Sequence, residues 1–566
     1  MTKVRYLLLL ATLISLGGCA THLHSSSQSE HTPAQYQPGQ LNGTTIVDIL
    51  SAELAARDNQ LPYSLQKYLK QAELTKDAGI AQRAARIAQH LRDSDALFRA
   101  VELWLNADSD AVEANQIMAN LLLHQGDFEK AQKHFKYALN QGRKQMLILL
   151  SSERQRMSKA ELRSYITLLD TVEKTADLAP ALLLSKGLLQ RQLGELQSAL
   201  KSFDAALALN ADLPTAVFQK ADTLKALKSF TKALNVVEAY LKKNPKDRQF
   251  SALQVQLLYL EEKSQRALQI TDQLIADNPS DQQLINYLAL TAFDFEHYEK
   301  SAQLLQKLLQ LSPSKTSPHY FLGLISERQQ DTAKAITHYE RVDSGDNALA
   351  AHNRAVYLHR SDEDITKIAQ LTASARQRMP NETVNLTITH AEWLHRQKRS
   401  ALAIDLLSKQ IALHPKSTEL LYSRAMYTEP DNFAAAEQDF KRILDLDPDN
   451  AVVLNAFGYT LTIHTQRFEE AHTLIARALE LSPEDPATLD SMGWVLFKLQ
   501  RVEEALEYLN RAFDAYQDPE VASHLISALA SINRLDDAKK IYEQMNASHP
   551  NNKFMDEARL VIEKSQ

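Results

Sequence analysis

Small side chains recur at a nearly constant spacing along most of the chain, within stretches whose apolar positions follow a helical period. A second small residue often stands twelve positions before them, as at Gly187, and a proline twelve positions after them, as at Pro245. Small side chains let two helices cross closely, because a larger one would force the backbones apart, and proline ends a helix. The pattern therefore predicts repeated pairs of antiparallel helices. The small residues, 33 to 35 positions apart, are Ala199, Ala233, Ala267, Ser301, Ala335, Ala369, Ala403, Ala436, Ala471, Ala505 and Ala538.

The regularity of this pattern varies along the chain. Tyr165 stands where a small residue is expected, and residues 348–380 follow the spacing weakly, with Asp362, Glu363 and Asp364 in place of the usual turn. The last segment is polar, as expected of a helix that covers the open end of a repeat array. The predicted parts of the folded chain are irregular leading helical repeats at 46–179, a regular array at 180–550 and a C-terminal capping helix at 551–566.

The composition fits a helical body and argues against some partners. Only 13 of the 566 residues are glycine, and the 63 basic and 70 acidic residues are well mixed, giving a net charge of −7. No basic stripe appears, so nucleic acid is not an expected partner. We therefore expect an all-α chain.

Two segments show the repeat most clearly: LLLSKGLLQRQLGELQSALKSFDAALAL from Leu182 and LDSMGWVLFKLQRVEEALEYLNRAF from Leu489. They resemble the tetratricopeptide repeat, which has two antiparallel helices per 34 residues. The resemblance implies a solenoid, a right-handed superhelix of helix pairs.

In this repeat family the first helix of each pair lines a concave binding surface. Large aromatic side chains at such positions are favoured partner contacts, although they could instead pack between neighbouring helices. The best single patch is expected at Tyr459, Trp494 and Phe497. The full set of candidate partner-binding residues is Phe218, Tyr259, Phe293, Tyr320, Tyr422, Tyr459, Trp494 and Phe497.

The N-terminus carries the only cysteine of the chain. Lys3 and Arg5 precede an apolar run, followed by Leu16-Gly17-Gly18-Cys19, the layout of a signal peptide over 1–18. The motif resembles the bacterial lipobox, which implies cleavage before Cys19 and acylation of that residue; an ordinary signal peptide remains the alternative. Residues 19–45 are polar and are expected to form a disordered tether. Ala20 is typical of lipoproteins sorted to the outer membrane, facing the periplasm.

We expect no catalytic site, no cofactor and no metal. HExxH, GxSxG and GxGxxG motifs are absent, and His390 and His395 stand five positions apart. Linker histidines such as His22 could bind a metal weakly, but solvated histidines are the commoner case. Some repeats of this type hold a peptide carboxylate with paired Lys and Asn, and that pattern is missing.

The leader, the tether and the array together resemble a proteobacterial family of outer-membrane repeat lipoproteins. The family includes the lipoprotein partner of a periplasmic carboxyl-terminal processing protease, a serine protease. The resemblance implies a non-enzymatic adaptor that presents peptidoglycan cross-link hydrolases to the protease and so regulates cell-wall turnover. Two alternatives stay open: an assembly factor for pili or peptidoglycan synthases, and a cryptic periplasmic hydrolase.

Overall fold

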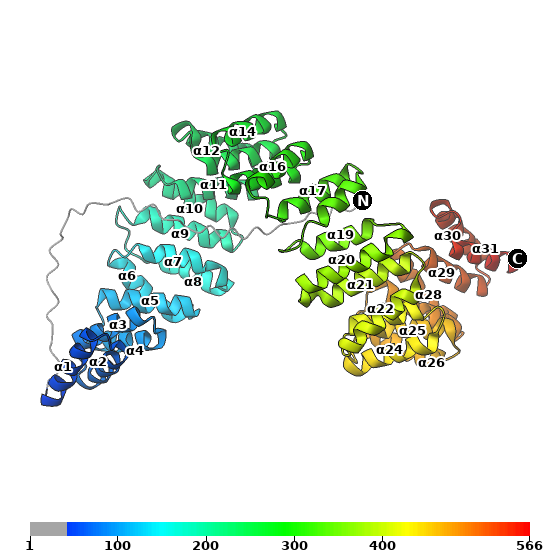
Figure 1. Ribbon diagram of the computed structural model, residues 1–566, viewed down its shortest axis with the longest axis horizontal. Helices are drawn as coiled ribbons and strands as arrows, with labels where there is room; N and C mark the ends of the chain where they lie inside the picture. Colours follow the sequence, from blue (N-terminus) through cyan, green and yellow to red (C-terminus); the bar gives the residue numbers. More distant parts are fainter. Residues whose placement is uncertain (1–41, 566) are drawn as a thin grey trace. The chain divides into compact units, whose positions relative to one another are not determined.

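The computed structural model describes residues 42–565. The predicted signal peptide, Cys19 and the tether as far as residue 41 lie outside the described residues. The chain divides into two compact units, one ending at Phe250 and the other beginning at Ser251. Within the described residues every regular element is a helix, and Figure 1 shows the helices of each unit following one another in chain order.

Most helices that are neighbours in the chain pack against each other as hairpins. The first unit contains α1 (Gly43–Arg57), α2 (Leu61–Thr75), α3 (Ala78–Leu91), α4 (Ser94–Ala107), α5 (Val112–Gln125), α6 (Phe128–Asn140), α7 (Gln145–Glu153), η1 (Arg154–Arg156), α8 (Lys159–Asp170), α9 (Ala179–Gln192), α10 (Leu196–Leu209), α11 (Pro214–Ala226), α12 (Phe230–Lys243) and the start of α13 (Arg248–Leu260).

The second unit continues with the same arrangement of helix pairs. Its elements are the rest of α13, α14 (Ser264–Asp277), α15 (Gln282–Asp294), α16 (Tyr298–Leu311), α17 (Ser317–Arg328), α18 (Thr332–Tyr339), α19 (Ala348–Leu358), η2 (Asp362–Asp364), α20 (Ile365–Arg378), η3 (Pro380–Glu382), α21 (Thr383–Arg396), α22 (Ser400–Leu413), α23 (Thr418–Thr428), α24 (Phe433–Leu446), α25 (Ala451–His464), α26 (Phe468–Leu481), α27 (Pro486–Lys498), α28 (Val502–Ala515), α29 (Pro519–Ser531), α30 (Leu535–Ser548) and α31 (Lys553–Lys564).

The small residues lie at the helix crossings, as the spacing predicts. Except at Ala369, every position of the ladder from Ala199 to Ala538 is completely buried. Gly493 on α27 shows why size matters there. A Cβ atom at this position would lie 2.5 Å from Leu509 Cγ and 3.0 Å from the backbone oxygen of Ala505, both on α28. The predicted tetratricopeptide-repeat hairpins are confirmed.

The turn and stop signals also act as predicted. Gly194 connects α9 to α10 with a φ of +82°, a conformation that suits glycine. Lys228 holds the equivalent position one repeat later with a φ of +57°. Pro245 follows the end of α12 by two residues, and Pro550 follows α30 by the same interval.

One boundary and one position of the ladder differ from the sequence prediction. Helix α1 begins at Gly43, inside the predicted tether, because the Asn42 side chain accepts a hydrogen bond from Thr45 N at 2.9 Å and caps the helix. The ladder position Ala369 is only half-buried, while Ile368 is completely buried. The 3₁₀ turn η2 precedes α20 and changes the phase at which this helix faces the core, so the prediction at Ala369 is wrong by one residue.

Other expected features take ordinary structural places. Tyr165, at an irregular ladder position, is buried and donates its hydroxyl to the backbone oxygen of Phe128 at 2.8 Å. Helix α31 lies within the segment expected to cap the array, and packs against α29 and α30. No helix among residues 42–565 combines the length and apolar character needed to span a bilayer.

Candidate protein-binding site

Three consecutive first helices, α25, α27 and α29, pack next to one another in the second unit. Each begins at a capping side chain. Asn450 accepts from Val453 N at 3.1 Å, Asp485 from Thr488 N at 2.8 Å, and Asp518 from Glu520 N at 2.8 Å. Proline occupies the first turn of α27 and α29, where its missing N–H costs nothing. These signals fix where the three helices start and therefore which side chains they bring together.

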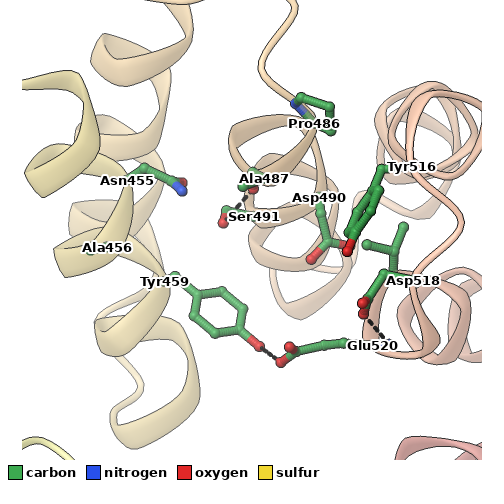
Figure 2. A pocket seen from close by; sticks show the side chains of 11 residues that line it. Asn455, Ala456, Tyr459, Pro486, Ala487, Asp490, Ser491, Tyr516, Asp518 and Glu520 are labelled. Atoms are coloured by element: carbon green, nitrogen blue, oxygen red, sulfur yellow. Dashed lines mark hydrogen bonds between the residues drawn. The ribbon is translucent and has the colours of Figure 1, made fainter. Parts of the chain in front are cut away.

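A groove of about 330 Å³ runs along these helices, and we call it the α25–α29 groove. Figure 2 shows Asn455 and Tyr459 extending from α25 toward the side chains of α27 and α29. The walls combine apolar and aromatic side chains with three carboxylates. The lining residues are Asn455, Ala456, Tyr459, Pro486, Ala487, Asp490, Ser491, Tyr516, Asp518, Glu520 and Val521.

Hydrogen bonds within the groove hold two of its carboxylates in place. Tyr459 donates its hydroxyl to Glu520 Oε1 at 2.5 Å, a bond that Figure 2 shows crossing the groove. Burial, together with this carboxylate, raises the pKa of Tyr459, so the phenol stays a donor at neutral pH. Both oxygens of Asp490 lie 3.0 Å from His524 Nδ1, and both residues are buried.

An aromatic stack lies behind this pair. The ring of Trp494 stacks on His524 with centroids 4.0 Å apart and on Phe497 at 5.2 Å. Lys498 places Nζ over the Trp494 ring, 4.3 Å from its centroid, and burial lowers the pKa of this lysine. The stack fixes the His524 ring against Asp490. The expected patch of Tyr459, Trp494 and Phe497 thus lies at and beside the groove, and its role in binding stays a prediction.

The other predicted contact residues pack mostly against aromatic neighbours. Phe218 is half-buried and meets Phe250 edge-on, with centroids 5.8 Å apart. The half-buried rings of Phe293, Tyr320 and Tyr422 likewise contact Phe321, Tyr339 and Phe440.

Tyr259 requires a correction. It is only 4% exposed, because it stacks on Phe295 and His297 from the turn of the next repeat. Its ring therefore stabilises the stacking of repeats and is not available to a partner.

The sequence reasoning missed the polar residues of the groove. Asn455, Asp490 and His524 stand 35 and 34 residues apart, at the equivalent position of three successive first helices. The same position holds Phe218, Tyr320 and Tyr422 in earlier repeats. A change from aromatic to polar residues at one repeat position is the signal that could have found them.

Besides the α25–α29 groove, a second candidate binding surface lies on helix α1. Its buried face consists of small and polar residues, Thr45, Asp48, Ala52 and Ala55. Its exposed face carries the large aliphatic ones, Ile46, Val47, Leu50 and Leu54, which are 52–61% exposed. Such a reversed pattern is typical of a helix face that contacts another molecule.

A metal site needs His, Cys, Asp or Glu side chains at close spacing. Within residues 42–565 no three His, Cys, Asp or Glu residues come close enough to hold a metal ion. His390 is buried, while His395 stacks on Tyr427 and lies 3.0 Å from Ser400 Oγ. The site therefore offers shape, charge and aromatic surface.

Known proteins match the chain over most or part of its length. TPR repeat-containing protein PA4667 of Pseudomonas aeruginosa is 35% identical over 536 residues, which cover 92% of this chain and 90% of that protein. Human mitochondrial import receptor subunit TOM70 is 24% identical over 122 residues, 22% of this chain and 20% of the receptor. The solved structure of Naa15/Naa10 bound to HypK-THB is 14% identical, covers 92% of this chain and 96% of its own, and has a TM-score of 0.38.

Family comparisons identify the repeat itself. Tetratricopeptide repeat families match residues 190–257, 462–529 and 286–351, and the TT21 fifth ARM repeats domain matches residues 112–210. These matches agree with the helix pairs and with the small residues at their crossings. Together with the 35% identity over 92% of the sequence, they show that the chain belongs to the tetratricopeptide-repeat protein family.

Proposed function

We propose that this protein is a non-enzymatic adaptor, anchored by lipid on Cys19 to the outer membrane and facing the periplasm. It binds a serine protease of the carboxyl-terminal processing type and presents substrates to it, chiefly peptidoglycan cross-link hydrolases. By holding protease and substrate on one body, it raises their effective concentration toward each other. The lipid confines this reaction to one surface, and the result is controlled cell-wall turnover.

The observation that supports this proposal most directly is the repetition of helix pairs in both compact units. Within each of the two compact units, the described helices follow one another in chain order and pack as pairs. The repeat fold is suited to protein–protein interaction, and this chain has two distinct candidate surfaces, the α25–α29 groove and the exposed face of α1. An adaptor needs at least two such surfaces.

Affinity capture tests the identity of the partners. The full chain, solubilised in detergent with its acyl groups, is immobilised, and bound periplasmic proteins are identified by mass spectrometry. The expected catch is a carboxyl-terminal processing protease together with cross-link hydrolases. Pilus or peptidoglycan-synthase subunits without the protease would contradict the proposal.

Membrane fractionation tests the anchor separately. Cys19→Ser removes the sulfur that would be acylated, so the variant should move from the membrane fraction to the soluble fraction while its helical circular dichroism is unchanged. His22→Ser, which alters the predicted tether and leaves Cys19 intact, should remain in the membrane fraction. A membrane-bound Cys19→Ser protein would overturn the lipid anchor.

A further inference from the structure

We propose that the α25–α29 groove binds a Lys or Arg side chain carried by an extended, otherwise apolar segment of a partner protein. This inference rests on the proposed function, since it specifies the kind of segment that the adaptor holds. The groove combines carboxylates, a negative charge balance and apolar walls.

Two of the three carboxylates keep an oxygen available to a ligand. Asp518 uses Oδ1 to accept from Glu520 N, and Glu520 uses Oε1 to accept from Tyr459. In the part of the chain that the structure describes, no side chain pairs with Asp518 Oδ2 or Glu520 Oε2. Asp490 is already held by His524 and adds its charge to the floor of the groove.

The charge balance of the groove is negative. None of the described lining residues is Lys or Arg, and the nearby Lys498 lies over the Trp494 ring. The N-termini of α27 and α29 face the groove, and each carries roughly half a positive charge. Together they offset about one of the three carboxylate charges, so the groove favours a cation.

The expected cation is organic, not a metal ion. Among residues 42–565 no cluster of carboxylates and histidines converges closely enough to ligate a metal. An ammonium or guanidinium group carries several N–H donors and can bind the free oxygens of Asp518 and Glu520 together.

The apolar part of the groove fits the rest of such a ligand. Ala456, Pro486 and Val521 can cover the methylene stem of a Lys or Arg side chain, whose charged end extends to the carboxylates. Tyr516, which is 60% exposed, offers an aromatic surface to the neighbouring residues of the segment. Charge complementarity and apolar contact thus point to one occupant, a basic residue within an apolar peptide.

The test uses the full chain in detergent and a phage-displayed library of random heptapeptides. A variant carrying Asp518→Asn and Glu520→Gln removes two charges, while each side chain keeps one oxygen that can accept the internal hydrogen bond from Glu520 N or Tyr459. Asparagine also caps a helix as well as aspartate does. The matched control, Glu507→Gln with Asp514→Asn, removes two charges from exposed positions of α28. A fluorescein-labelled copy of the most enriched heptapeptide then measures affinity, beside a copy with its basic residue changed to glutamine.

We expect enrichment of Lys or Arg at one position between apolar residues. The Asp518→Asn/Glu520→Gln variant should bind the labelled peptide at least about tenfold more weakly than the wild-type chain does. The wild-type chain should bind the peptide with glutamine in place of its basic residue more weakly by a similar factor. The control variant should bind the labelled peptide normally. Three results would overturn the proposal: no enriched sequence, enrichment of acidic peptides, or a labelled peptide that binds the Asp518→Asn/Glu520→Gln variant as tightly as the control variant.

A second copy of this chain is the competing occupant. Light scattering across a concentration range tests it: self-association that disappears in the Asp518→Asn/Glu520→Gln variant would show that a basic side chain of another copy fills the groove, and would overturn the partner-segment proposal. The outcomes remain separable from those of the adaptor. If affinity capture finds the protease but the groove shows no preference for basic peptides, only the present inference is refuted. If the groove selects basic peptides but no protease is captured, only the adaptor proposal is refuted.

Discussion

Tyr459 on α25 donates its hydroxyl to Glu520 on α29, 61 residues further along the chain. The two residues belong to repeats that are not neighbours, and the bond passes beside α27, the first helix of the repeat between them. Most contacts in a solenoid join adjacent repeats, so a side-chain bond of this reach couples three repeats directly. It also fixes the carboxylate that the proposed ligand would meet.

Replacing Tyr459 with phenylalanine tests this coupling. The loss of a hydrogen bond to a charged acceptor should destabilise α25, α27 and α29 by about 1.5–3 kcal/mol. Hydrogen exchange measured by mass spectrometry should then show faster exchange in these helices and unchanged exchange in α9. Tyr516→Phe is the control, because this ring is exposed and should leave exchange unaltered. If α25, α27 and α29 exchange at the same rate in the Tyr459→Phe and Tyr516→Phe variants, the bond does not couple the repeats.

Gly493→Ala tests the close crossing of α27 and α28. The added methyl group would meet Leu509 and the backbone oxygen of Ala505, so we expect a loss of about 1–3 kcal/mol in thermal unfolding. Gly43→Ala is the matched control, since a Cβ atom there meets nothing within 4 Å. If the two substitutions have equal effects, crowding at the crossing does not explain the ladder of small residues.

Lys228→Gly tests the strain of the turn between α11 and α12. Lys228 is exposed and has a φ of +57°, which costs a residue with a side chain roughly 1 kcal/mol relative to glycine. The substitution should therefore raise the stability of the first unit by about that amount in urea unfolding. Lys228→Ala removes the same side chain without relieving the backbone and should give no gain. A gain in the alanine variant would attribute the effect to the lysine side chain instead.

Buried histidines should make the protein less stable in acid. Burial, with the charge of Arg376, lowers the pKa of His390 to about 4 from 6.5, and its Nδ1 has no hydrogen-bond partner within the described residues. As the pH falls from 6.5 to 4, the unfolded chain binds a proton that the folded chain does not. The free energy of unfolding therefore falls over this window, by up to roughly 3 kcal/mol for this residue.

Thermal midpoints at pH 7.5 and pH 5 measure this effect. His390→Leu removes the titrating ring and should reduce the drop between the two pH values. His90→Gln, at an exposed position of α3, should leave the drop unchanged. Burial also lowers the pKa of His352 to about 4, so part of the drop should remain in the His390→Leu variant. An identical drop in all three proteins would exclude His390 as a source of acid sensitivity.

The fold was predictable because one local steric requirement repeats. Each helix crossing excludes a large side chain, so residues such as Gly187 and Ala505 mark the crossings without any knowledge of tertiary contacts. Ala369 shows the limit of that reasoning. A short 3₁₀ turn before α20 shifts the helix by one residue, and spacing alone carries no information about this change of phase.

The groove was less predictable for a different reason. Asn455, Asp490 and His524 share a repeat position but have unrelated chemistry, so a search for identical residues passes over them. Their charges and hydrogen bonds acquire meaning only when three helices stack. Tyr259 illustrates the opposite error. The repeat position predicts an exposed ring, but two rings from the next repeat bury it.

Reconstitution of proteolysis tests the adaptor account most directly. The purified full chain, the carboxyl-terminal processing protease of the same organism and one cross-link hydrolase are mixed in all combinations, and loss of intact hydrolase is followed over time. The account predicts rapid loss when all three are present, slow loss with the protease alone, and none with the repeat protein alone. Cleavage by the repeat protein alone, or a protease rate that the repeat protein does not change, would contradict it.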